Sequence, residues 1–181
     1  MKPVDGLRVT LISRDILTPY SGMLPGYVEG LYDDHEITID LSHLARLAGA
    51  RLIHGDVSSL DANRKKLTIT GRPEIGYDRL SINIGSSPDL TSIKGAEDFA
   101  IPVKPISRLL ENLKPVLAPE ATPSQHTKTI AIIGAGAAGV EMAFSLHHRL
   151  VEREKRNLRF IVIQRGARIM VEFPKKAANV L

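Results

Sequence analysis

The chain has 181 residues, of which 43% are apolar and 24% are charged, and its formal net charge is +4. That length suggests one domain, or one and a fraction, and the apolar share is enough for a core. No apolar run approaches the roughly 18 residues of a membrane-spanning helix, and the absence of cysteine excludes a disulfide framework, a thiol nucleophile and a cysteine metal site.

The first part of the chain combines a strand pattern with a turn-rich stretch. Residues 7–12 are branched and alternate like a strand, whereas 18–26 hold prolines and glycines and predict a loop. A short helix is expected over 41–48, with Asp40 or Ser42 as its N-cap.

Three further strand patterns occupy the middle of the chain, at 51–57, 67–70 and 75–84. A Gly-Arg-Pro turn at 71–73 separates the last two of them. We therefore expect a small antiparallel meander next to a strand that re-enters a parallel sheet.

Prolines then mark a boundary. They stand at Pro102, Pro105, Pro115, Pro119 and Pro123. We interpret 105–126 as a Pro-rich linker that contains a short helix over 107–113. This divides the chain into a first unit over 1–104 and a second over 127–181.

One segment of the second unit indicates a chemistry. An isoleucine-rich run ends at a glycine-rich turn, which is followed by a helix pattern over 140–156 and an apolar run over 158–163. The turn consists of Gly134, Ala135, Gly136, Ala137, Ala138 and Gly139. The order strand, Gly-x-Gly-x-x-Gly, helix, strand is typical of a Rossmann-type nucleotide-binding unit.

Each glycine has a physical role in such a turn. Gly134 permits the tight strand-to-helix turn, Gly136 lets the backbone approach a pyrophosphate, and Gly139 lets the helix pack on the strand. The helix then directs its unpaired N–H groups and the positive end of its dipole toward the phosphates. The alternative is a glycine-rich loop that serves packing alone.

The residue at the end of the second strand bears on the choice between NAD and NADP. An acid that bonds the adenosine ribose is expected about 20 residues beyond the glycines, and Gln164 stands there. Arg165 or Arg168 could pair with a 2′-phosphate, or both could be solvated loop residues. Both NAD and NADP therefore remain candidates. Glu141 lies near the start of the helix, where the dipole favours a carboxylate.

Basic residues gather on the same helix, at Arg149, Arg153, Lys155 and Arg156. Acidic residues interrupt them, and the aromatic interleaving of single-strand binders is missing. We interpret them as a solvated surface and expect no nucleic-acid partner.

Taken in order, these motifs resemble those of a known family. The stretches that carry the resemblance are VTLISR at 9–14, YSGMLPG at 20–26, YDRL at 77–80, GSSP at 85–88 and VKPI at 103–106, together with the glycine turn. The chain resembles the pyridine-nucleotide-linked flavoprotein oxidoreductases with two dinucleotide-binding domains. Within them it is most similar to type II NADH dehydrogenases and their relatives associated with selenide water dikinase.

The resemblance implies an α/β fold of Rossmann-like parallel sheets with an antiparallel meander, that is, two partial dinucleotide-binding domains. It implies hydride transfer from NAD(P)H to FAD, and electron transfer from there to a quinone or another acceptor. Ser13 and Arg14 fall where the family's FAD domain meets the adenosine ribose, Val57 where it meets adenine, and Gly85 where a turn approaches the flavin. The family also often has an acid at the position of Glu141, facing the nicotinamide.

The chain departs from the family pattern at both ends. Only six residues precede Leu7, so the strand and glycine turn that cradle the FAD pyrophosphate are missing from the sequence, and we do not expect tight, independent FAD binding by this polypeptide. The chain also stops soon after the second strand of the nicotinamide unit. We therefore interpret it as an internal piece of about half of a family member.

No metal site and no catalytic proton-transfer residue are assigned. Residues 33–36 read Asp-Asp-His-Glu, but adjacent side chains point in different directions. The alternatives to the enzyme are a non-catalytic nucleotide-binding module and a homodimer formed through exposed sheet edges. With no signal-peptide pattern, we expect a cytoplasmic protein, and the full-length protein could lie against the inner face of a membrane.

Overall fold

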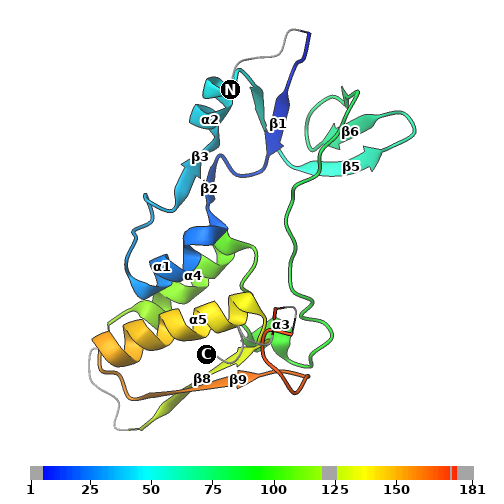
Figure 1. The fold of residues 1–181 in the computed structure, drawn as a ribbon. Helices are drawn as coiled ribbons and strands as arrows, with labels where there is room; N and C mark the ends of the chain where they lie inside the picture. Colours follow the sequence, from blue (N-terminus) through cyan, green and yellow to red (C-terminus); the bar gives the residue numbers. More distant parts are fainter. Residues whose placement is uncertain (1–5, 120–125, 172, 175–181) are drawn as a thin grey trace. The chain divides into compact units, whose positions relative to one another are not determined.

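The computed structural model describes residues 6–119, 126–171 and 173–174. Contacts divide the chain into two compact units (Figure 1): Met1–Tyr20 with Thr38–Ser86, and Ser21–Ile37 with Ser87–Leu181. We refer to them as unit 1 and unit 2. The domain limits expected from the proline-rich segment stay a prediction.

Unit 1 contains a parallel strand pair. β1 (Thr10–Ser13) lies beside β4 (Arg51–His54), and Ser13 pairs with His54 at their carboxyl ends. β2 (Leu17–Pro19) pairs antiparallel with β3 (Thr38–Asp40), which leads into α2 (Leu41–Leu47). Ile53 on β4 and Ala45 on α2 are buried. The expected helix and its Asp40 cap are confirmed.

The predicted meander is also present in unit 1. It consists of β5 (Val57–Asp61), β6 (Lys66–Ile69) and β7 (Ile75–Gly76), all antiparallel. The expectation of one strand over 51–57 was wrong, because the chain turns between β4 and β5. At this turn a Cβ on Gly55 would lie 2.6 Å from Cγ2 of Ile69.

The strand expected over 75–84 was wrong beyond Gly76. Residues 80–90 form no helix or strand, and the side chains of Ile82 and Ile84 are 62% and 90% exposed. Alternating apolar residues favour a strand, but a ladder also needs a neighbouring strand with a free edge. In the described part of unit 1 no such neighbour pairs with this stretch.

The cap of α2 makes unit 1 sensitive to acid. The Asp40 carboxylate accepts from the N–H groups of His43 and Ser42, and these bonds hold the pKa of Asp40 below its ordinary value of 3.8. Because the folded pKa is the lower one, the cap stabilises the fold fully above pH 3.8 and is lost as pH falls through the folded pKa. Asp40→Asn should remove this part of the acid dependence, measured by urea unfolding between about pH 5 and pH 2.5. Parallel curves for both proteins would contradict this role of the cap.

Unit 2 packs helices on one face of a parallel strand pair. β8 (Lys128–Ile133) and β9 (Leu158–Ile163) pair from Lys128↔Leu158 to Ile133↔Ile163. The helical elements are η1 (Ser21–Met23), α1 (Leu24–Glu29), α3 (Ala96–Phe99), α4 (Ile106–Leu117), α5 (Ala137–His147) and a π-helical turn, η2 (His148–Arg153). The parallel β8–α5–β9 unit confirms the Rossmann-like expectation.

The core of unit 2 lies between α1, α4, α5 and the strand pair (Figure 1). Its buried residues are Leu24, Val28, Leu109, Leu113, Leu117, Met142, Leu146 and Leu150. Two sequence expectations change here. The loop expected over 18–26 runs into helix α1, and the short helix expected over 107–113 extends through Leu117.

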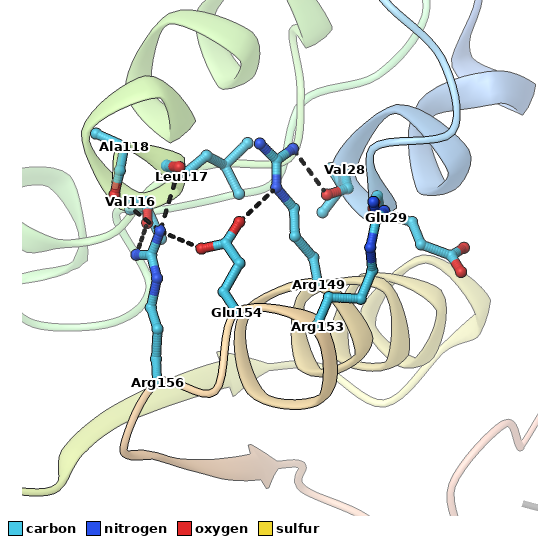
Figure 2. A network of polar contacts seen from close by, with 9 residues as sticks. All are labelled: Val28, Glu29, Val116, Leu117, Ala118, Arg149, Arg153, Glu154 and Arg156. Carbon is cyan, nitrogen blue, oxygen red and sulfur yellow. Dashed lines mark hydrogen bonds and ion pairs between the residues drawn. The ribbon is translucent and has the colours of Figure 1, made fainter. Parts of the chain in front are cut away.

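Three arginines expected on a solvated surface bond the ends of helices. The expectation was wrong for Arg149 and Arg156, which are partly buried, whereas Arg153 is exposed. Arg149 Nη1 donates to the carbonyl oxygen of Val28 at 3.2 Å, and Arg153 Nη1 to that of Glu29 at 2.9 Å. Figure 2 shows Arg156 doing the same at the end of α4, with Glu154 between Arg149 and Arg156. Helix C-termini leave carbonyl groups without partners, and cations there also meet the negative end of the dipole.

Candidate nucleotide-binding site

The site begins where β8 turns into α5. Gly134 has φ +101°, a conformation that side-chain-bearing residues rarely adopt, and its N–H donates to the carbonyl oxygen of Ile163 at 2.8 Å. A Cβ on Gly139 would overlap the carbonyl oxygen of Gly134. The predicted roles of these two glycines, in the tight turn and in close packing, agree with the structure.

Gly136 combines open surroundings with an ordinary backbone conformation. A Cβ built on it would meet nothing within 4 Å, as at Gly134, but its backbone has φ −76°, which any residue can adopt. The space beside Gly136 is therefore open. No side chain caps α5 at Gly136. The first backbone hydrogen bond of the helix runs from the N–H of Val140 to the carbonyl oxygen of Gly136. α5 begins at Ala137 rather than at the expected 140, so Ala137, Ala138 and Gly139 contribute amides of its first turn.

An apolar groove of about 290 Å³ lies alongside the first turns of α5. Its lining residues are Pro25, Ala137, Val140, Glu141, Phe144, Ser145 and Met170. Glu141 supplies the one carboxylate among them, on the exposed side of the helix. Of these lining residues, Ala137 and Glu141 were predicted from the sequence. Helical spacing from these two was a usable signal for Val140, Phe144 and Ser145, whereas Pro25 and Met170 reach the groove only through the fold.

The segment after β9 folds back onto the glycine turn. Met170 N–H donates to the carbonyl oxygen of Ala135 at 2.7 Å. Between the end of β9 and Met170, Gln164 Nε2 donates to the carbonyl oxygen of Gly166 at 2.7 Å, and the side chain of Arg165 is exposed. The structure thus brings Gln164 and Arg165 to the same edge as the glycine turn.

The residues that the resemblance assigned to FAD lie in unit 1. Ser13 and Arg14 follow each other at the carboxyl end of β1, where Ser13 Oγ donates to the Asp15 carbonyl oxygen at 2.7 Å. Val57 begins β5. Gly85, with φ +71°, lies in the stretch that forms no regular element. The structure therefore brings Ser13 and Arg14 together and gives Val57 and Gly85 separate positions.

The Asp-Asp-His-Glu stretch forms a local turn. The Asp33 carboxylate accepts from the N–H groups of His35 and Glu36 at 2.9 and 3.0 Å, and the Glu36 carboxylate accepts from the N–H of Asp33. Next to it, burial and a hydrogen bond to Asp34 raise the pKa of Tyr27. Across the described residues, no group of three or more His, Cys, Asp or Glu side chains is placed to hold a metal ion.

No helix among the described residues has both the length and the apolar character to cross a membrane.

Comparisons with known proteins agree with this geometry. The chain is 30% identical over 179 residues to the NADH dehydrogenase-like protein YutJ of Bacillus subtilis, covering 97% of this chain and 46% of that protein. It is 26% identical over 144 residues to demethylphylloquinone reductase NdbB of Synechocystis, covering 77% of this chain and 34% of that protein. The chain thus spans less than half the length of these relatives.

Among solved structures, NDH2 of Plasmodium falciparum in complex with NADH superposes with a TM-score of 0.76 at 18% identity. The match covers 95% of this chain and 40% of that one, and at this identity it shows the fold. The pattern of the family described as pyridine nucleotide-disulphide oxidoreductase matches residues 2–181. FAD and NAD(P)H are the cofactors of that family. The chain therefore belongs to the pyridine nucleotide-disulphide oxidoreductase family, which also agrees with the NADH dehydrogenase-like protein and the quinone reductase among its relatives.

Proposed function

We propose that this chain carries the nicotinamide-dinucleotide site of an NAD(P)H-dependent, FAD-linked oxidoreductase that delivers electrons to a quinone. The observation that carries the proposal is the open backbone at Gly136, in front of a helix whose first turn has no side-chain cap. A Cβ at this position would fill the space that a pyrophosphate needs. The residues present thus fit a dinucleotide.

Each part of the site has its own task. The amides from Gly136 to Gly139 would hold the pyrophosphate, and Gln164 and Arg165 would lie toward the adenosine ribose. Glu141 and the apolar groove would orient the nicotinamide end. The cofactors supply the redox chemistry, a hydride passing between nicotinamide and flavin, and the protein supplies position and electrostatics. No general base is required among these residues.

The described part of unit 1 fits only part of FAD. We propose that Ser13 and Arg14 lie toward the adenosine ribose of FAD. Val57 would lie toward its adenine, and Gly85 toward its flavin ring. The helix that follows β3, α2, cannot receive a pyrophosphate in the same way as α5, because the Asp40 side chain occupies its first amides. The described residues of this chain therefore account for more of the dinucleotide site in unit 2 than of the flavin site in unit 1.

A quinone acceptor is supported by two relatives whose names include quinones. One is the Synechocystis reductase described above. The other is the alternative NAD(P)H-ubiquinone oxidoreductase C1 of Arabidopsis thaliana, 25% identical over 162 residues that cover 81% of this chain and 31% of that protein. The chain contains no cysteine, so a disulfide relay cannot operate within it and direct transfer from flavin to acceptor is favoured.

The purified chain, supplied with FAD, NAD(P)H and a soluble quinone, tests this proposal. We expect the nucleotide to bind, and NADH oxidation to require added FAD in excess, because tight FAD binding by this polypeptide is not expected. A protein that binds NADH but does not oxidise it at any FAD concentration would support a nucleotide-binding module instead. A colourless protein that binds neither nucleotide but elutes as a dimer would contradict both and favour a structural role.

A further inference from the structure

The structure distinguishes the two arginines that follow β9. Arg168 is bonded to its own segment, because Nη2 donates to the carbonyl oxygen of Val171 at 2.6 Å and Nη1 to that of Phe173 at 3.1 Å. Arg165 is exposed, and no group in the described part of the chain bonds its guanidinium. Arg165 is thus the arginine with its donors available to a ligand.

The position of Arg165 is set from both sides. Ile163, two residues before it, accepts a hydrogen bond from Gly134, and Met170, five residues after it, donates to Ala135. The intervening segment is therefore held against the glycine turn at each end. The bond from Gln164 Nε2 to the Gly166 carbonyl oxygen spans Arg165 and fixes the local turn that presents it.

The charge of this segment has one sign. Residues 164–171 contain two arginines and no acid. A carboxylate at the end of the second strand would accept from the 2′-hydroxyl of an adenosine ribose and would repel a phosphate at that position. Gln164 is neutral, so it repels neither a 2′-hydroxyl nor a 2′-phosphate. A guanidinium offers a planar pair of donors that matches a phosphate.

We propose that Arg165 makes this site prefer a dinucleotide with a 2′-phosphate, NADP(H), over NAD(H). The inference deepens the proposed function and rests on it, because a residue that distinguishes the 2′-phosphate from the 2′-hydroxyl matters only where the glycine turn binds a dinucleotide. Arg168 has a different task, which is to hold the segment that returns to the glycine turn.

Calorimetric titration of the full chain with NADPH and with NADH tests the inference without requiring flavin or turnover. We expect NADPH to bind about tenfold more tightly, the equivalent of one hydrogen bond between charged groups. Arg165→Ala should lower the NADPH affinity about tenfold and change the NADH affinity less than about twofold. Arg159→Ala, an exposed arginine on β9, is the matched control and should change neither.

Two further measurements separate the outcomes. Adenosine 2′,5′-bisphosphate should bind more tightly than 5′-AMP, and Gln164→Glu should shift the preference toward NADH. Equal binding of NADH and NADPH by the unaltered protein, or an equal loss of both in Arg165→Ala, would overturn the inference while leaving the dinucleotide site in place. Failure to bind either dinucleotide would overturn the proposed function and the inference with it.

Discussion

Gly136→Val is expected to abolish dinucleotide binding while leaving the fold in place. The valine side chain would enter the open space beside the glycine turn, where we propose that the pyrophosphate lies. Loss of two charge-assisted bonds of about 1.5–3 kcal/mol each corresponds to at least a hundredfold weaker Kd. The backbone, with φ −76° and ψ −179°, accepts valine, so stability should change by less than about 1 kcal/mol. Titration with NADH and urea unfolding give the two readouts.

Gly139→Ala is the matched comparison for this variant. Its Cβ would overlap the carbonyl oxygen of Gly134, so α5 would have to move away from the turn. We expect a loss of about 1–3 kcal/mol of stability, as for other overpacked sites, together with weaker binding. Stability and binding should therefore separate in Gly136→Val and fall together in Gly139→Ala. Unchanged NADH affinity in Gly136→Val would remove the turn from the site.

Arg156→Ala should cause the largest loss of stability among the charged residues discussed. Its side chain is 9% exposed. Nη1 donates to the Val116 carbonyl oxygen at 2.9 Å, and Nη2 to those of Leu117 and Ala118 at 3.3 and 2.8 Å. Truncation would leave these carbonyls at the end of α4 without the arginine, at an expected cost of about 2–4 kcal/mol. Urea unfolding measures it.

Arg159→Ala provides the control for this experiment, because Arg159 is exposed on β9 and should cost less than about 0.5 kcal/mol. Arg156→Lys should recover only part of the lost stability, because one ammonium group cannot present the same fork of donors to three carbonyl oxygens. If Arg156→Ala unfolds at the same urea concentration as Arg159→Ala, the carbonyls at the end of α4 do not depend on Arg156.

Local patterns made the glycine turn and the Asp40 cap predictable. The close approach of Gly139 to the Gly134 carbonyl oxygen joins residues a few positions apart, and the Asp40 carboxylate accepts from an N–H in the next turn of the chain. The parallel pair around α5 could also be expected, because a strand, a helix and a second apolar strand in sequence favour that arrangement. These features need no knowledge of distant contacts.

Long-range contacts explain what the sequence did not reveal. Arg149 and Arg153 bond carbonyls that lie 121 and 124 residues away, so nothing local distinguishes them from surface arginines. Helix α1 contains Pro25 and Gly26, which predict a turn, yet Leu24 and Val28 are buried in the core of unit 2. Tertiary packing outweighs local propensity in α1.

The proposed preference for NADPH lies between these two cases. The sequence already showed Gln164 and Arg165 in place of an acid and favoured Arg165 over Arg168 for the ribose side, but it did not show what Arg168 bonds. The bonds of Arg168 to the Val171 and Phe173 carbonyl oxygens distinguish them. Hydrogen bonds of this kind depend on how the segment folds back, which local patterns do not predict.

Amide spectra of the nitrogen-15-labelled protein, recorded during titration with NADH, test the assignment of the site most directly. We predict that the amides from Gly136 to Gly139 shift most and saturate together, because their N–H groups receive the pyrophosphate. Shifts confined to other parts of the chain, with these four amides unmoved at saturation, would contradict it.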